Sequence, residues 1–171
     1  MPRYVAFLRG VSPMNAKMAD LKSCFEDLGF RDVKTVLSSG NVVFTGSSQS
    51  ETHLARMIES GMTKHLPRSF PTIVRRVDYL ATLLARDPFS EFHISAKEKR
   101  VVTFLSEPHR GQLSLPIESD GVRILAMNGS EAFTVYQPNP RGPVFMTLLE
   151  KTFGKRITTR TLDTVRKCVA A

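Results

Sequence analysis

Two short stretches in the first quarter of the chain carry side chains that suit an anion-binding site. Their members are Arg9, Gly10, Asn15 and Lys17 in the first stretch and Ser38, Ser39, Gly40 and Asn41 in the second. Cationic groups, short hydroxyl and amide donors and a helix N-terminus all bind phosphate or carboxylate groups. A purely structural interpretation competes with this one: Asn15 caps a helix, Ser39-Gly40-Asn41 turns a hairpin, and Arg9 pairs with a carboxylate. Neither stretch is a Walker or dinucleotide-binding fingerprint.

The apolar pattern around these stretches predicts the elements that position them. Met18, Leu21, Phe25 and Leu28 share one helical stripe, whereas short apolar and β-branched runs indicate strands. We expect strands at 4–8, 33–37, 41–45 and 72–77, and helices at 17–28 and 50–65. This βαββαβ order is that of the ferredoxin-like unit. Its first crossover makes the first two strands parallel, so the loop after strand one and the following hairpin emerge at the same end of the sheet.

The second half of the chain predicts a further α+β region. We expect a strand at 101–105, a hairpin of 122–127 and 132–136 around Asn128-Gly129, a helix starting at Pro143, and a last helix capped by Thr158 or Thr159. If residues 108–116 were helical, this half would repeat the βαββα order of the first. The predicted fold is therefore α+β, with a ferredoxin-like subdomain at 1–78 and a smaller second α+β subdomain at 79–171.

The composition is that of an ordinary globular protein. The 171 residues are 42% hydrophobic and 23% charged, and the formal net charge is +8. Six Lys and Arg residues against one Asp make the segment after Glu150 basic, which is typical of a solvated surface and leaves a nucleic-acid face as an alternative. RNA recognition on a βαββαβ sheet needs exposed aromatic side chains, for which only Tyr4 and Phe44 are suitably placed.

Other kinds of site find little support in the residues. The four histidines and two cysteines, Cys24 and Cys168, have no metal-ligand spacing, and no cofactor is predicted. Of the adjacent pair Arg75-Arg76, strand alternation sends one side chain towards packed structure, where a structural ion pair is expected. No stretch is long enough to span a bilayer, so we expect no membrane partner, a cytoplasmic location and free thiols. The oligomeric state stays open.

Three segments together resemble the domain-of-unknown-function family 1697. The opening one is Tyr4-Val5-Ala6-Phe7-Leu8-Arg9-Gly10 with Met18-Ala19-Asp20-Leu21; the central one is Thr35 to Phe44; the closing one is Ile157-Thr158-Thr159-Arg160 with Thr164-Val165 and Lys167. The resemblance implies a bacterial-type α+β protein without an assigned activity, so no catalytic residue can be carried over. Arg160, in the closing motif, joins the candidate ligand-binding residues.

The chain departs from the family pattern at two places. The family usually continues Arg-Gly with Ile-Asn-Val-Gly-Gly, where this chain has Val11-Ser12-Pro13-Met14. The family also tends to follow Thr-Arg with Asn-Trp, where this chain has Thr161-Leu162, and it contains no Trp at all. The loop is therefore stiffer and offers fewer backbone N–H groups, and any ligand surface made by that Trp is lost.

Three functions remain open on these grounds. The first is binding of an anionic or phosphorylated small molecule at the strand-one and hairpin end of the sheet, with the question of catalysis open. The second is association with nucleic acid through the basic C-terminal segment. The third is an interaction module without a small ligand.

Overall fold

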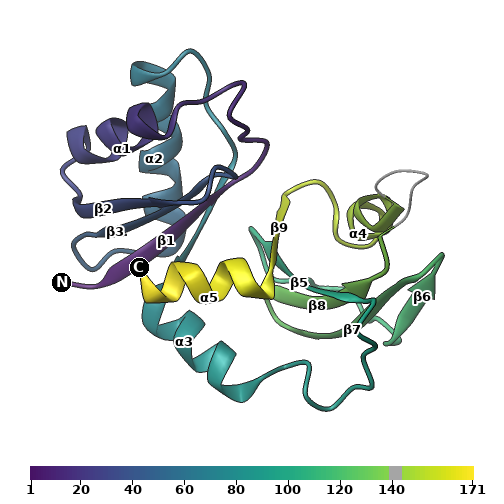
Figure 1. Cartoon of the computed structure of the whole chain (residues 1–171). Helices are drawn as coiled ribbons and strands as arrows, with labels where there is room; N and C mark the ends of the chain where they lie inside the picture. Colours follow the sequence, from purple (N-terminus) through teal and green to yellow (C-terminus); the bar gives the residue numbers. More distant parts are fainter. Residues whose placement is uncertain (139–143) are drawn as a thin grey trace. The chain divides into compact units, whose positions relative to one another are not determined.

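The computed structural model describes residues 1–138 and 144–171 and divides the chain into two compact units. The first unit contains Met1–Leu83 and Val165–Ala171, and the second contains Leu84–Thr164. The sequence-based division into 1–78 and 79–171 differs from this one at two places: the first unit extends to Leu83, and it also includes Val165–Ala171. The α+β class is confirmed: helices and antiparallel sheets are both present in the described chain (Figure 1).

The first unit has the predicted βαββαβ order of elements. They are β1 (Arg3–Leu8), α1 (Met18–Asp27), β2 (Arg31–Val36), β3 (Asn41–Thr45), α2 (Glu51–His65) and β4 (Thr72–Arg76), followed directly by α3 (Val77–Arg86). The strands form one sheet in the order β2-β3-β1-β4, in which every neighbouring pair is antiparallel. The strands β1 and β2 therefore run parallel without touching, as the crossover requires.

The core of this unit lies between the sheet and the helices α1 and α2 (Figure 1). Strand alternation sends Tyr4, Ala6 and Leu8 of β1 into this core, and the helical stripe of α1 brings Leu21 and Phe25 against them. The opposite face of β1, with Val5 and Phe7, is also fully buried. At the strand's start, the Arg3 Nε donates to the carbonyl of Ala171 (3.2 Å), which ties the C-terminus to β1.

The starts of the two helices differ from each other. Ser50 caps α2, because its hydroxyl accepts a hydrogen bond from the backbone N–H of His53 (3.1 Å). Helix α1 begins one residue after Lys17, whose side chain makes no capping hydrogen bond. The predicted role of Asn15 as the helix cap is therefore wrong. Asn15 lies two residues further out, in the loop after β1.

The second unit holds a five-stranded antiparallel sheet. Its elements are β5 (Lys99–Leu105), β6 (Ile117–Ser119), β7 (Val122–Asn128), β8 (Glu131–Tyr136), α4 (Val144–Phe153) and β9 (Ile157–Thr161), and α5 (Leu162–Ala170) starts here and continues into the first unit. The strand order is β6-β7-β8-β5-β9. Leu149 of α4 packs on one face together with Leu105, Ile124 and Ile157.

Two expectations for this half need correction, and one cannot be compared. Residues 106–116 form no helix, so the second half does not repeat the first. Thr158 and Thr159 belong to β9, and the hydroxyl that accepts the N–H of Thr164 at the start of α5 is that of Thr161 (3.2 Å). Pro143, the expected first residue of α4, lies outside the described residues. The predicted hairpin is present, with Gly129-Ser130 as its turn.

Within the described chain, no helix combines the length and apolar character needed to cross a membrane.

Candidate functional site

The loop after β1 and the β2–β3 turn meet at one end of the first sheet, as predicted. The N–H of Leu8, the last residue of β1, donates to the carbonyl of Gly40 (2.8 Å), and Phe7 lies opposite Asn41 in the register. A Cβ at Gly40 would lie 2.8 Å from the carbonyl oxygen of Leu8 and 3.0 Å from the Cβ of Val11. Gly40 also has φ +88°, which a side chain rarely tolerates. The two segments are therefore in direct contact, and glycine is required there.

Asn41 has a structural role in this arrangement. Its side chain is completely buried, and its amide Nδ2 donates to the carbonyl of Val36 and to the hydroxyl of Ser39 (both 3.0 Å). An amide nitrogen has two donors, so both are used within the turn. Asn41 shapes the β2–β3 turn, and it offers no amide proton to a ligand.

Asn15 fixes the other segment in the same way. Its Oδ1 accepts the N–H of Ser12 (2.9 Å), and its Nδ2 donates to the carbonyl of Gly10 (2.8 Å). These two bonds join Asn15 to backbone groups three and five residues earlier and so close the loop after β1 on itself. Asn15 thus holds the loop that carries the cations.

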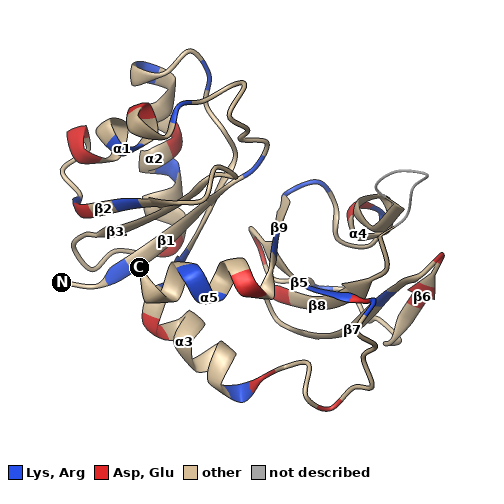
Figure 2. Cartoon of the chain, viewed as in Figure 1, with Lys and Arg blue, Asp and Glu red and all other residues tan. Residues whose placement is uncertain are grey.

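The cations and hydroxyls of the two segments lie nearer to solvent. Lys17, Ser38 and Ser39 are exposed, and Arg9 is half-buried with its backbone N–H donating to the carbonyl of Pro71 (2.9 Å). Neither the loop from 9 to 17 nor the turn from 37 to 40 contains an acidic residue. In Figure 2 the loop that follows β1 accordingly shows blue segments and no red one. This end of the first unit presents two positive charges with no negative charge on the same segments.

Arg160 does not belong to these segments. It lies on β9 in the second unit, opposite Val102, and its Nη1 donates to the hydroxyl of Thr158 (2.8 Å) and to the carbonyl of Thr159 (2.7 Å). The basic C-terminal segment is likewise divided. Its cations lie on α4, on the connection to β9, on β9 and on α5, and so on both units. One continuous basic element is therefore not present.

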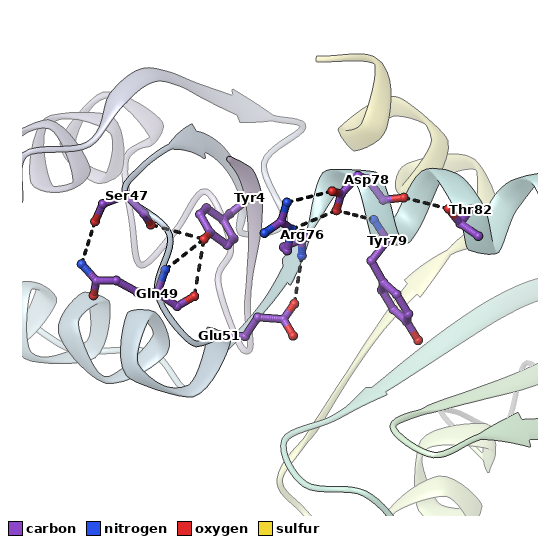
Figure 3. A network of polar contacts seen from close by, with 8 residues as sticks. All are labelled: Tyr4, Ser47, Gln49, Glu51, Arg76, Asp78, Tyr79 and Thr82. Atoms are coloured by element: carbon purple, nitrogen blue, oxygen red, sulfur yellow. Dashed lines mark hydrogen bonds and ion pairs between the residues drawn. The ribbon is translucent and has the colours of Figure 1, made fainter. Parts of the chain in front are cut away.

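The aromatic side chains considered for RNA stacking are in the core. Tyr4 and Phe44 are completely buried and stack on each other with centroids 5.5 Å apart. The Tyr4 hydroxyl is also used, because it lies 3.3 Å from the carbonyl of Ser47 and 3.4 Å from that of Gln49 (Figure 3). Neither ring is available to stack on a base.

The adjacent arginines of β4 lie on opposite faces of the strand, as strand alternation predicts: Arg75 is buried and Arg76 is at the surface. Arg75 is 7% exposed, whereas the Arg76 guanidinium reaches Asp78 at the surface in a fork (3.0 and 2.8 Å). The backbone N–H of Arg76 also donates to Glu51 at the start of α2 (2.9 Å; Figure 3). The hydrogen bond from Arg76 is the main reason why the pKa of Asp78 is lowered. An ion pair was expected at the buried arginine, Arg75, whose Nη1 donates to the carbonyl of Val74 (3.0 Å). The ion pair with Asp78 lies at the other arginine, Arg76, where it fixes the junction of β4 and α3.

Sequence reasoning missed several buried polar groups of the second unit. Thr103 and Thr134 are fully buried, and among the described residues their hydroxyls have no hydrogen-bond partner, nor does the Nε2 of His109. The sequence does not reveal that such a hydroxyl is unbonded, because the hydroxyl of a buried Thr usually donates a hydrogen bond to a nearby carbonyl. Cys24 and Cys168 are free and buried, and burial raises the pKa of the Cys24 thiol. Within the ranges 1–138 and 144–171, no three His, Cys, Asp or Glu residues form a metal-binding group.

Comparison with known proteins supports the resemblance noted above. A conserved bacterial protein from Streptococcus pneumoniae has a similar structure, with a TM-score of 0.73 at 20% sequence identity, over 99% of this chain and 97% of that one. At this identity the similarity shows the fold alone. None of the curated proteins compared with the chain matches it. The profile of the family described as "Protein of unknown function (DUF1697)" matches residues 1–132, so the chain belongs to that family.

Proposed function

We propose that this protein binds an anionic or phosphorylated small molecule at the end of the first sheet where the loop after β1 meets the β2–β3 turn. One observation carries the proposal. The two segments are in contact, contain no acidic residue, and include the cations Arg9, directly after β1, and Lys17, directly before the start of α1. The N-terminus of a helix attracts negative charge, and a cation at the N-cap position, here Lys17, adds to that attraction, whereas the carboxylate of Asp20 in the first turn of α1 opposes it.

The candidate residues then have two distinct roles. Arg9 and Lys17 supply positive charge, and the exposed hydroxyls of Ser38 and Ser39 supply further hydrogen bonds. Asn15 and Asn41 hold the two segments in place and do not touch the ligand. A hydrogen bond to a charged group contributes about 1.5–3 kcal/mol, so removing one cation should weaken binding roughly ten- to a hundredfold.

Calorimetric titration with inorganic phosphate, followed by a thermal-shift screen of phosphorylated and carboxylated metabolites, tests this proposal. A ligand that binds the native state raises its melting temperature. Lys17→Ala and Arg9→Ala should each weaken phosphate binding, and Lys22→Ala is the matched control because Lys22 is an exposed lysine within α1, outside the two site segments. Equal loss in the Lys22→Ala protein, or no binding of any anion, would count against the site.

Nucleic-acid binding would give a different result in a simple experiment. A protein that neutralises several phosphates releases counterions, so its affinity falls steeply with salt concentration. A gel-shift series of mixed RNA and DNA at increasing salt would show such a slope, and we expect none at physiological ionic strength. Substitution of the exposed Arg166 and Lys167 of α5 should then leave phosphate binding unchanged.

We also infer a cytoplasmic location. Both cysteines are free and buried in the described structure, which agrees with a reducing compartment. Thiol labelling of the unfolded protein after rapid quenching of expressing cells should modify both residues. Oxidised cysteines would instead indicate export.

A further inference from the structure

The Asn-Gly pair of the β7–β8 hairpin is a feature of the second unit that the proposed anion site does not use. Asn128 is the last residue of β7, and Gly129-Ser130 forms the turn to β8. Asn128 and Gly129 are both exposed. Gly129 has a φ of +50°, and a Cβ added to it would have no atom within 4 Å. Solvent therefore reaches both residues of the pair.

The side chain of Asn128 differs from those of Asn15 and Asn41 in its bonding. The Asn15 amide is bonded on both sides within its loop, and the Asn41 amide donates both of its protons and is completely buried. The Asn128 side chain makes no hydrogen bond within the part of the chain that the structure describes. Because hydrogen bonds hold an amide in one conformation, the Asn15 and Asn41 side chains are fixed and the Asn128 carboxamide is free to rotate.

The backbone of this turn is held through its carbonyl groups. The Gly129 carbonyl accepts the N–H of His109 (3.2 Å), and the Ser130 carbonyl accepts the N–H of Leu105 (2.8 Å). The N–H of Gly129 itself has no partner among the described residues. Because glycine has no side chain, no atom of Gly129 shields this nitrogen. The Gly129 nitrogen and the Asn128 Cγ are therefore both accessible, and they are the two atoms that a five-membered ring would join.

We propose that Asn128-Gly129 is a site of spontaneous deamidation, with water as the co-reactant. The Gly129 nitrogen loses its proton to a solvent base and attacks the Asn128 Cγ, so that a new C–N bond closes a succinimide ring. The bond between Cγ and Nδ2 breaks, and Nδ2 leaves as ammonia after taking a proton from water. Water then opens the ring at either carbonyl, which gives aspartate or isoaspartate at position 128. The reaction needs no oxidant or reductant.

The product places a second acidic side chain on the hairpin. Asn128 lies opposite Glu131 in the register of β7 and β8. Side chains directly opposite each other on neighbouring strands interact, and like charges there are destabilising. Isoaspartate also lengthens the backbone at the residue that precedes the turn. Deamidation should therefore weaken the hairpin and lower the stability of the second unit.

Ageing of the full-length protein at neutral and mildly alkaline pH, followed by peptide mapping with mass spectrometry, tests this proposal. A synthetic peptide with the sequence of residues 124–133 is the unfolded reference. The native chain should deamidate at Asn128 at a rate within about tenfold of that of the peptide, and faster at higher pH because the attacking nitrogen must lose its proton. Asn15 and Asn41 are controls within the same digest and should stay unmodified. A native rate more than about tenfold below that of the peptide would show that the hairpin keeps the reacting atoms apart, and would overturn the proposal.

Two variants separate the modification from its consequence. Asn128→Gln should form no product, because its cyclisation would need a larger ring, and an undiminished release of ammonia from this variant would place the reaction elsewhere and contradict the proposal. Asn128→Asp reproduces one of the two products, and its melting temperature should be about 1–4 °C below that of the Asn128→Gln protein. Equal melting temperatures would contradict the predicted weakening of the hairpin, whereas the mass spectra alone decide the site.

Discussion

The two units differ in how they satisfy the polar groups that they bury. In the first unit, the buried polar side chains have backbone partners: the Asn41 amide donates to Val36, the Thr72 hydroxyl to Phe70 and the Arg75 guanidinium to Val74. In the second unit, the buried Thr158 hydroxyl accepts a hydrogen bond from Arg160, but the hydroxyls of Thr103 and Thr134 are buried without a partner among the described residues. Both sheets are antiparallel and both have apolar cores, so this difference is not a consequence of fold class.

This difference in hydrogen bonding indicates which parts of the chain are held in one local conformation. A buried polar group that is fully bonded fixes one conformation, whereas an unbonded one costs free energy and fixes nothing. The bonded groups of the first unit include those that shape the proposed site. In the second unit, the Arg123 guanidinium binds Glu98 through two hydrogen bonds (2.9 and 3.1 Å) at a partly buried position.

The largest effect is expected for Gly40→Ala, which tests the contact between the two site segments. The new Cβ would lie 2.8 Å from a backbone oxygen of Leu8, and the residue has a positive φ. Overpacking and conformational strain together should lower the free energy of unfolding by about 3 kcal/mol. Gly29→Ala is the matched control, because Gly29 has a similar φ of +93° and no atom within 4 Å of the added Cβ. Equal losses in urea denaturation would show that the close contact has no cost.

Asn41→Ala should have the next largest effect. The substitution removes two buried hydrogen bonds and leaves the Val36 carbonyl without this donor, so a loss of about 2 kcal/mol in unfolding free energy is expected. Asn128→Ala, at an exposed residue beside the hairpin turn of the second unit, should change stability by less than about 0.5 kcal/mol. A small effect at Asn41 would mean that the first unit is not held by its buried polar groups.

The Glu98–Arg123 pair predicts a pH-dependent contribution in the second unit. The pKa of the Glu98 carboxyl is lowered, chiefly by the Arg123 hydrogen bonds, with a further contribution from the backbone N–H of Ser95. Because the folded-state pKa is below the unfolded value of about 4.3, the stabilisation is complete above that value and is lost as the pH falls through the folded-state pKa. Glu98→Gln should therefore lower the melting temperature at neutral pH, and the gap from the unmodified protein should close in acid. A gap that persists in acid would contradict this assignment.

The smallest effect, and one of opposite sign, is expected for Thr103→Val and Thr134→Val. Each replaces a buried hydroxyl without a protein partner by a methyl of the same shape, so each should raise the free energy of unfolding by about 1 kcal/mol or leave it unchanged. Thr72→Val, in the first unit, removes a hydroxyl bonded to the Phe70 carbonyl (2.9 Å) and should lower stability by about 1 kcal/mol. If all three variants were destabilised alike, the hydroxyls of the second unit would have partners after all, and the contrast between the units would disappear.

The first half of the fold could be predicted almost completely from the sequence. The strands and helices of the βαββαβ unit lie within two residues of their expected bounds, because the helical stripe of α1 and the short apolar and β-branched runs of the strands indicate the same elements. The second half was harder. Residues 108–116, whose helical state the sequence pattern left open, form no helix. The start of α5 was predicted at the wrong threonine, because β9 precedes α5 directly.

The proposed site, like the fold, could be predicted from the sequence only in part. The meeting of the loop after β1 with the β2–β3 turn follows from strand connectivity alone, so sequence reasoning found it. The direction and bonding of each side chain does not follow from connectivity. Asn15 and Asn41 were expected to bind ligand, and instead their amides hold the two segments from within. Arg160 was grouped with them from its motif and lies in the other unit.

The sequence by itself determined the α+β class, the order of elements in the first unit and the basic character of the site segments, because these depend on local pattern and composition. Only the tertiary structure decided which polar side chains are hydrogen-bonded within the protein and which remain exposed to solvent. A buried amide such as that of Asn41 and an exposed cation such as Lys17 are equally polar in the sequence, and they differ only in whether neighbouring backbone groups reach them. Those neighbours come from other strands and loops, and their positions are set by packing over the whole unit.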